Sequence, residues 1–254
     1  MKINKIMKRA LLQVRKRYYL SKYSMLSPGT IEWLVGTEIK YGGIETNVPR
    51  NKVSPKDPRT KEQLSRGGMV GGDRMLHHGY AKKYSEYLLP YVKKDTPLTV
   101  TEFGILKGTG LSIWCDLFQN ARILGLDIDL GHINSNMANL KNLGAFRRNQ
   151  PELYEFDQFL DNIEYLGTIL KGDRIDICID DGPHSAESIL STMKSVMPYL
   201  SDKFVYFIED NKDVHKEIKS IYPDLVVDRE GELTVVSKNE ECRCHQGAIR
   251  LNNQ

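Results

Sequence analysis

The chain has 254 residues, 40% of them hydrophobic, and a formal net charge of +3. This length suits one large α/β domain with an extension, and the charge is too weak to indicate nucleic-acid binding, so we expect no nucleic-acid partner. No apolar run approaches the roughly 20 residues that cross a bilayer, and Lys and Arg interrupt the apolar residues near the start, which argues against a secretory signal. The 4 cysteines are too few for a dense disulfide framework, and we predict a cytoplasmic protein.

The first predicted element is a helix over residues 1–22, a segment rich in Lys and Arg and without any acid. Its apolar residues recur at helical spacing: Ile3, Ile6, Met7, Ala10, Leu11 and Val14. We favour packing of this helix on the body of the protein or on a second subunit, and we expect a homo-oligomer. The alternative is a peripheral contact with an anionic membrane surface.

Residues 42–72 predict a long loop, because glycine pairs and prolines leave no room for a long regular element. A loop of this length inside a domain is usually functional or disordered, and we favour a lid over the active site. Its basic residues would either grip the phosphates of an anionic saccharide or form a solvated face: Arg50, Lys52, Arg59 and Arg66. A helical pattern resumes over 74–92, and it contains His77 and His78, either of which is a candidate substrate contact.

From residue 98 onward, strand-like apolar segments alternate with helix-length segments. Strands are predicted at 98–103, 122–127, 153–156, 175–180, 203–209, 224–228 and 232–237. Helices are predicted at 109–120, 132–142, 158–171, 185–199 and 211–221. This alternation predicts βαβ units, and the short connection between the last two strands predicts a hairpin whose final strand is antiparallel. We therefore expect an α/β fold with a Rossmann-like seven-stranded mixed sheet and helices on both faces.

These patterns divide the chain into an N-terminal extension with the lid (1–97), the sheet domain (98–237) and a polar tail (238–254). The tail contains Cys242, Cys244 and His245, which are metal-ligand types. They have too few partners for a closed metal site, so we expect no metal there.

The first strand of the sheet domain leads into a glycine-rich turn, in which Gly104, Gly108 and Gly110 follow Glu102. Glycines allow a ligand to approach the backbone closely, but this spacing is not the dinucleotide fingerprint. An acid at Glu102 argues against a pyrophosphate and for a cationic ligand, such as the amino or sulfonium group of S-adenosylmethionine.

Acids at the next two strand ends extend this candidate nucleoside site. The carboxylate of Asp127 can accept hydrogen bonds from both hydroxyls of a ribose, and Asp129 is the alternative. Asp157, after the third strand, is a candidate for contact with the adenine amino group.

Two further strands also end in acids. Asp180 and Asp181 precede His184, and Glu209-Asp210 ends the following strand. The carboxyl ends of parallel strands meet at one sheet edge, so these acids should together hold a divalent cation beside an imidazole that can take a proton. We expect one adjacent aspartate to cap the following helix and favour Asp181 as the ligand. Without a nearby cationic side chain these acids would repel one another, which favours a bound metal.

Several of these motifs resemble those of known methyltransferases. The stretch from Glu102 to Gly110, Trp114, and Gly125-Leu126-Asp127-Ile128-Asp129 resemble class I S-adenosylmethionine-dependent methyltransferases. Other motifs are similar to the magnesium-dependent macrocin/mycinamicin-type sugar O-methyltransferases: Asp180-Asp181-Gly182-Pro183-His184, Pro198-Tyr199-Leu200, Tyr206-Phe207-Ile208-Glu209-Asp210, Asp73-Arg74, His78, Tyr80 and Tyr84. The resemblance covers about residues 72–237.

The resemblance implies roles for individual residues. Asp181, Glu209 and Asp210 match the metal ligands, and His184 matches the general base, so His184 and Asp181 are the expected catalytic residues. The predicted cofactor-binding residues are Glu102, Gly104, Gly108, Asp127, Asp129, Asp157 and Asp180.

The resemblance also implies an activity. A methyl group would pass from S-adenosylmethionine, with Mg²⁺ or another divalent cation, to a sugar hydroxyl of a nucleotide sugar, a capsule or lipopolysaccharide, or a glycosylated natural product. A non-sugar small molecule with adjacent hydroxyls would chelate equally well and is an alternative acceptor. A non-catalytic nucleoside-binding module is a third interpretation, which the acids on two strands disfavour.

Overall fold

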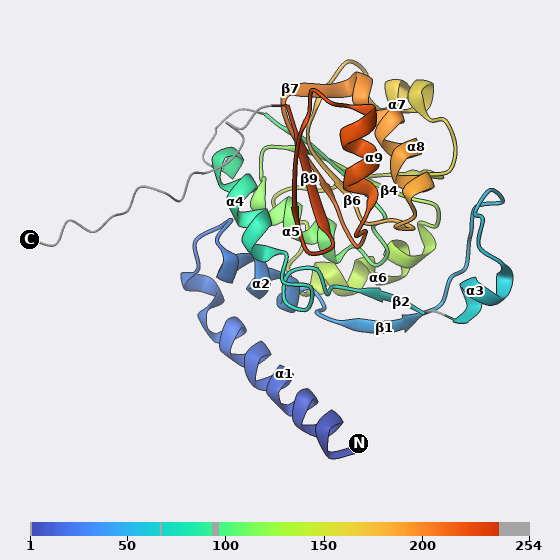
Figure 1. The fold of residues 1–254 in the computed structure, drawn as a ribbon. Helices are drawn as coiled ribbons and strands as arrows, with labels where there is room; N and C mark the ends of the chain where they lie inside the picture. Colours follow the sequence, from blue (N-terminus) through green and yellow to red (C-terminus); the bar gives the residue numbers. More distant parts are fainter. Residues whose placement is uncertain (1, 67, 93–96, 239–254) are drawn as a thin grey trace, which may run out of the picture.

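A seven-stranded mixed sheet forms the centre of the computed structural model, which describes residues 2–66, 68–92 and 97–238. The strands are β3 (Thr99–Phe103), β4 (Arg122–Asp127), β5 (Glu152–Glu155), β6 (Ile175–Asp180), β7 (Leu200–Ile208), β8 (Val226–Glu230) and β9 (Leu233–Ser237). Their order is β5-β4-β3-β6-β7-β9-β8, and β9 is antiparallel to both of its neighbours (Figure 1). The predicted seven-stranded mixed sheet with an antiparallel last strand is confirmed.

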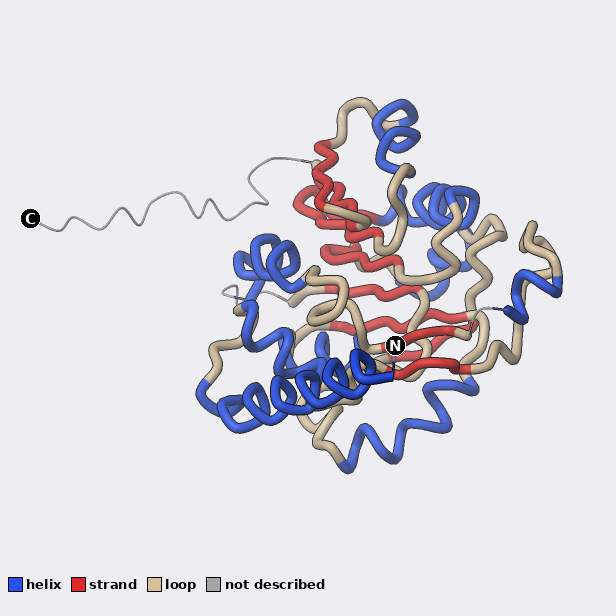
Figure 2. Tube along the Cα trace, turned by 60° about the horizontal axis from the view of Figure 1, so that its bottom comes forward, coloured by secondary structure: helices blue, strands red, loops and turns tan. Residues whose placement is uncertain are grey.

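Helices cover both faces of the sheet (Figures 1 and 2). Alternate strand residues point to opposite faces, so Ile177 and Ile179 join one hydrophobic layer and Cys178 joins the other. The first layer is formed with α2 (Ile31–Lys40), α4 (Ala81–Val92), α5 (Thr109–Leu117) and α6 (Gly131–Asn142). The second is formed with α7 (Ile163–Leu170), α8 (Ala186–Val196), η2 (Met197–Tyr199) and α9 (Val214–Ile221).

The N-terminal segment is helical, as predicted. Helix α1 (Lys2–Lys22) is followed by the 3-10 turn η1 (Tyr23–Met25), packs against α2 and lies at the edge of the molecule (Figures 1 and 2). Leu11, Val14 and Tyr18 of α1 are exposed, and a second subunit or a membrane surface as their partner stays a prediction. Among the described residues, no helix has both the length and the apolar character needed to cross a membrane.

Helix α2 lies in a segment, residues 23–41, without a predicted element. It begins after Thr30, whose side chain accepts a hydrogen bond from the Trp33 backbone N–H. Trp33 and Leu34 are buried in the same hydrophobic layer as the central strands. The N-terminal extension therefore shares a core with the sheet domain.

The lid segment, residues 42–72, contains three short elements. Strands β1 (Glu45–Val48) and β2 (Met69–Gly71) form an antiparallel pair, and α3 (Lys61–Arg66) lies between them in the chain. Figure 1 shows these elements extending to one side of the molecule. The prediction that this segment has no long regular element is confirmed.

Two predicted helices begin at least five residues later in the structure than predicted, at Ala81 and Ile163. Residues 74–80 form turns before α4 begins at Ala81, and Gly79 in this stretch has φ +77°, which a continuous helix does not allow. The helix predicted at 158–171 is confined to α7, because Asn162 hydrogen-bonds to the Asp157 carbonyl and holds the preceding residues in a loop. The predicted tail with Cys242, Cys244 and His245 lies outside the described residues.

Candidate functional site

A cavity of about 400 Å³ lies at the carboxyl edge of the sheet and beneath the lid segment. In α/β proteins this edge is where ligands bind. The predicted site residues that line the cavity are Glu102, Gly104, Asp127, Asp129, Asp157, Asp181, His184 and Asp210. Gly108, Asp180 and Glu209 were also predicted, but they do not line it.

The acids at the ends of β4 and β5 shape the loops around the cavity. Asp127 Oδ2 accepts hydrogen bonds from the backbone N–H groups of Ile105 and Leu106, both at 2.9 Å. Asp127 Oδ1 accepts one from the Asp129 N–H at 3.0 Å. Asp157 Oδ1 accepts one from the Phe159 N–H at 3.0 Å. A carboxylate can accept about four hydrogen bonds. These acids therefore hold their loops and can still accept hydrogen bonds from a ligand in the cavity.

Two of the glycines that follow β3 have different roles. Gly104 has φ +82°, and a Cβ there would lie 2.2 Å from the Asp181 carbonyl oxygen, so only glycine allows these loops to meet. Gly108 has φ +81°, and a Cβ there would lie 2.7 Å from the Ile133 side chain. Gly108 therefore permits close packing on α6, away from the cavity.

Asp180 is buried beside the cavity. Its carboxylate accepts hydrogen bonds from Gln158 Nε2 at 2.8 Å and from the Tyr206 hydroxyl at 3.1 Å. Burial raises its pKa from 3.8 to about 6. Ser185, whose side chain accepts from the Ser188 N–H, caps α8, so the expectation that Asp180 or Asp181 caps this helix is wrong.

Arg74 is buried among three acids from different strand ends. Its guanidinium nitrogens lie 2.7 Å from Glu102 Oε1, 2.7 Å from Asp181 Oδ2 and 3.1 Å from Glu209 Oε1. The guanidinium also lies 5.5 Å from the centre of the Trp114 ring. The expectation that the acids have no cationic neighbour is therefore wrong.

One guanidinium leaves this acidic cluster incompletely neutralised. Burial raises the pKa of Glu102, Asp181 and Glu209, and the nearby Arg74 charge opposes this effect. Glu209 also accepts a hydrogen bond from the Tyr84 hydroxyl, which turns it toward the buried side of the cluster. The remaining negative charge favours a bound cation or bound protons at the cavity end of the cluster.

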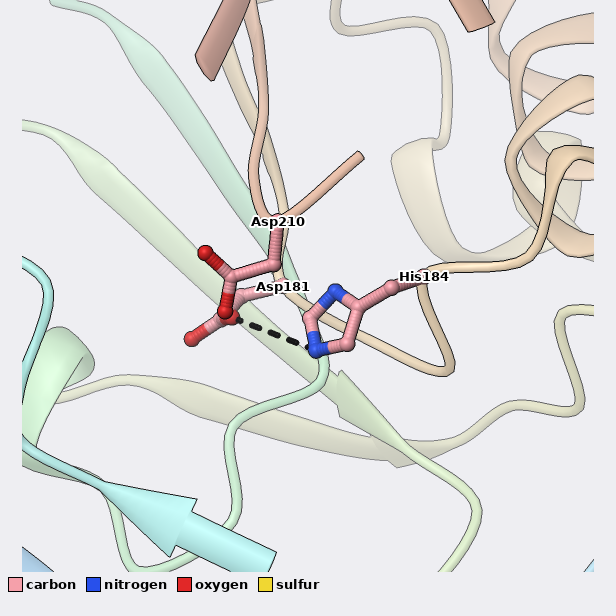
Figure 3. A group of neighbouring side chains, drawn as sticks. All are labelled: Asp181, His184 and Asp210. Atoms are coloured by element: carbon pink, nitrogen blue, oxygen red, sulfur yellow. Dashed lines mark ion pairs between the residues drawn. The ribbon is translucent and has the colours of Figure 1, made fainter. Parts of the chain in front are cut away.

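Asp181 also belongs to a second, half-buried group with His184 and Asp210, on the cavity side of this cluster. Each offers one ligand atom, and these atoms lie within 4.8 Å of one another. The three side chains converge from the loops after β6 and β7, which are paired in parallel (Figure 3). His184 has φ +61° and Asp210 has φ +57°, a backbone conformation that is uncommon for residues other than glycine and that tends to cluster at functional sites.

Residues before α4 hold Asp210 from the other side. The Tyr80 hydroxyl donates to Asp210 Oδ1 at 2.6 Å, and His78 Nδ1 lies 3.6 Å from the same oxygen. His78 Nε2 lies 3.1 Å from Asp73 Oδ2. His78, and not His77, lines the cavity.

Two residues of this site had no predicted role. Glu38, on α2, accepts hydrogen bonds from the backbone N–H groups of Met75 at 2.9 Å and Leu76 at 3.0 Å, directly after Arg74. Burial raises the pKa of Glu38 to about 7. In the sequence, the signal for a role of Glu38 was its position as an acid within an apolar helical stretch. For Arg74 the signal was only the resemblance of Asp73-Arg74 to a family motif.

The sheet order has counterparts among solved structures. The MycE methyltransferase from the mycinamycin biosynthetic pathway, in complex with Mg and SAH, aligns with a TM-score of 0.51 and 20% identity over 69% of this chain. A second MycE structure, with Mg, SAH and mycinamycin VI, aligns with a TM-score of 0.50 and 20% identity over 65% of this chain.

The chain has the class I methyltransferase fold. It covers 53% and 50% of the two MycE chains, so it spans about half the length of these proteins. No protein-family model and no curated protein matches the chain.

Proposed function

We propose that this protein transfers a methyl group from S-adenosylmethionine to a sugar hydroxyl and requires a divalent cation. One observation carries the proposal: a single cavity joins the acids at the ends of β3, β4 and β5 to the Asp181–His184–Asp210 group. The presence of Mg and SAH in the MycE structures supports the same assignment.

The residues present fit the cofactor. Glu102 lines the cavity, and its buried Oε2 accepts no hydrogen bond of ordinary geometry among the described residues, although Trp114 interacts with this carboxylate. An orphaned buried acceptor is costly, and the amino group of S-adenosylmethionine would satisfy it. Asp127 and Asp129 would accept hydrogen bonds from the ribose hydroxyls, and Asp157 from the adenine amino group.

The residues present also fit a divalent cation. Arg74 engages Asp181 Oδ2, so Asp181 Oδ1 and the Asp210 carboxylate are the oxygen ligands that we assign to the ion, with Glu209 retained as the partner of Arg74. When bound, the ion would lower the pKa of a coordinated hydroxyl and hold it in place.

We assign to His184 the role of general base, which accepts the proton of the acceptor hydroxyl. Its Nε2 lies 4.0 Å from Asp181 Oδ1, at the cavity end of the acidic cluster. His184 Nε2 would accept the proton of the attacking hydroxyl, and S-adenosylmethionine would supply the methyl group for the new C–O bond, with the electron pair of the S–C bond going to sulfur. The products are the methyl ether and a neutral thioether.

A methyl-transfer assay tests this proposal. The protein is incubated with S-adenosylmethionine labelled in the methyl group and a panel of sugars, nucleotide sugars and catechols, with Mg²⁺ or with a chelator. We expect label on a sugar acceptor only with the metal, and His184→Gln should lower kcat by about 10²–10⁴-fold without weakening cofactor binding. Label on catechols alone would exclude the sugar acceptor, and a protein that does not bind S-adenosylmethionine would exclude the activity.

A further inference from the structure

The lid segment places positive charge on the wall of the proposed active site. Arg50, Lys52 and Arg59 line the same cavity as Asp181 and Asp210. The methyl-transfer chemistry proposed above uses none of these three cations. Their partners therefore indicate what else the cavity binds.

Four of the five Lys and Arg residues that line the cavity already form an ion pair with a carboxylate of the protein. Lys52 lies 2.7 Å from Glu155, Arg59 lies 2.5 Å from Asp57, and Lys107 lies 2.5 Å from Glu45. Arg74 is held by the acidic cluster. Arg50 makes no ion pair and no hydrogen bond with any of the described residues, although it is only partly exposed.

The loop that carries Arg50 has a defined structure. Asp57 is held by a hydrogen bond from its N–H to the Ser54 carbonyl at 3.1 Å, and its side chain is 3% exposed. Both Asp57 oxygens accept from the Arg59 guanidinium, and Oδ1 also accepts from the Arg59 N–H at 2.9 Å. The carboxylate whose charge acts on Arg50, that of Asp57, is therefore already hydrogen-bonded to Arg59.

Asp57 thus lies in the field of two guanidinium groups at the cavity wall, and it pairs with that of Arg59. Burial, and next the charge of Arg59, lower the pKa of Arg50, and the charge of Asp57 opposes them, so the charged form of Arg50 is only partly compensated. A guanidinium in this position binds a phosphate or another oxyanion through paired N–H donors.

We infer that Arg50, beside the Arg59–Asp57 pair, forms an anion subsite for the methyl acceptor, so that the acceptor is a saccharide that carries a phosphate or diphosphate group. This inference rests on the proposed function, because it places the acceptor in the same cavity as the cofactor. The oxyanion could also come from the carboxylate of the cofactor itself, and the experiment separates these two sources.

The binding of simple anions tests the subsite, and it does not require that the methyl acceptor be identified. Inorganic pyrophosphate and uridine diphosphate are titrated calorimetrically into the protein without divalent cations, with and without saturating S-adenosylhomocysteine. Arg50→Ala is compared with Lys56→Ala, an exposed residue of the same loop that does not line the cavity. Thermal melting confirms that both variants fold.

We expect Arg50→Ala to raise the Kd for pyrophosphate and uridine diphosphate by about tenfold or more. Lys56→Ala should leave both Kd values unchanged, and neither variant should change the affinity for S-adenosylhomocysteine. Absent anion binding by the wild-type protein, or equal losses in both variants, would overturn the subsite. A loss of S-adenosylhomocysteine affinity alone in Arg50→Ala would assign Arg50 to the cofactor and also overturn it. Failure of the wild-type protein to bind S-adenosylhomocysteine would instead overturn the proposed function.

Discussion

Arg74 donates a hydrogen bond to Asp181 Oδ2 at 2.7 Å, while Asp181 Oδ1 faces His184 Nε2 at 4.0 Å. One oxygen of this carboxylate is thus held by a buried cation, and the other is presented to the cavity. Glu38 accepts hydrogen bonds from the backbone immediately after Arg74, so two parts of the N-terminal extension together position the cation of the acidic cluster.

Arg74→Gln should lower the free energy of unfolding by about 3–5 kcal/mol, because the buried acids around it lose their cation. Denaturation in urea measures the change. Lys194→Gln, which breaks the exposed pair between Lys194 and Asp161, serves as the control and should leave the midpoint nearly unchanged. A similar small effect in both variants would show that the acidic cluster does not depend on Arg74.

Gly104→Ala should destabilise the protein more than Gly172→Ala. Both glycines have positive φ, +82° and +100°, so both variants carry the backbone cost of about 1–2 kcal/mol. A Cβ at Gly104 would also lie 2.2 Å from the Asp181 carbonyl oxygen, whereas nothing lies within 4 Å of a Cβ at Gly172. Urea denaturation of the two variants compares them, and equal losses would contradict the close contact between the two loops.

Asp180→Asn should change how stability depends on pH. The pKa of Asp180 rises from 3.8 to about 6 on folding, so the folded state binds more protons between these values and the wild-type protein loses stability as pH rises through them. The loss is complete above pH 6 and amounts to about 3 kcal/mol. The difference in unfolding free energy, variant minus wild type, should therefore increase by this amount from below pH 4 to pH 7. A difference that does not vary with pH would show that Asp180 is not perturbed.

Much of the fold could be predicted because its signals are local. The strand from Ile175 to Asp180 is a short apolar run that ends in acids, and its predicted bounds are those of β6. The hairpin of β8 and β9 followed from a short connection rich in charged residues and glycine. Helix α2 was missed, although Thr30 and Glu32 carry a helix start signal, because its buried residues show no clear alternation with polar ones.

The acidic cluster was predicted only in part, because its cation comes from a distant segment. Arg74 is separated from Asp181 by 107 positions, and no periodicity connects a turn residue to a strand end. The placement of Asp181 and Asp210 followed from the parallel pairing of β6 and β7. The orientation of Glu209 toward Tyr84 depends on side-chain packing, which no sequence pattern specifies.

Direct measurement of ion binding tests the central claim, that two neighbouring strand ends hold a divalent cation in the cofactor cavity. Mn²⁺, which takes the same oxygen ligands as Mg²⁺, is titrated into the protein saturated with S-adenosylhomocysteine and followed by electron paramagnetic resonance. We predict one bound Mn²⁺ per chain, lost in Asp181→Asn and Asp210→Asn and retained in Asp224→Asn, an exposed acid that does not line the cavity. No bound Mn²⁺ in the wild-type protein, or binding that survives in Asp181→Asn and Asp210→Asn, would contradict the account.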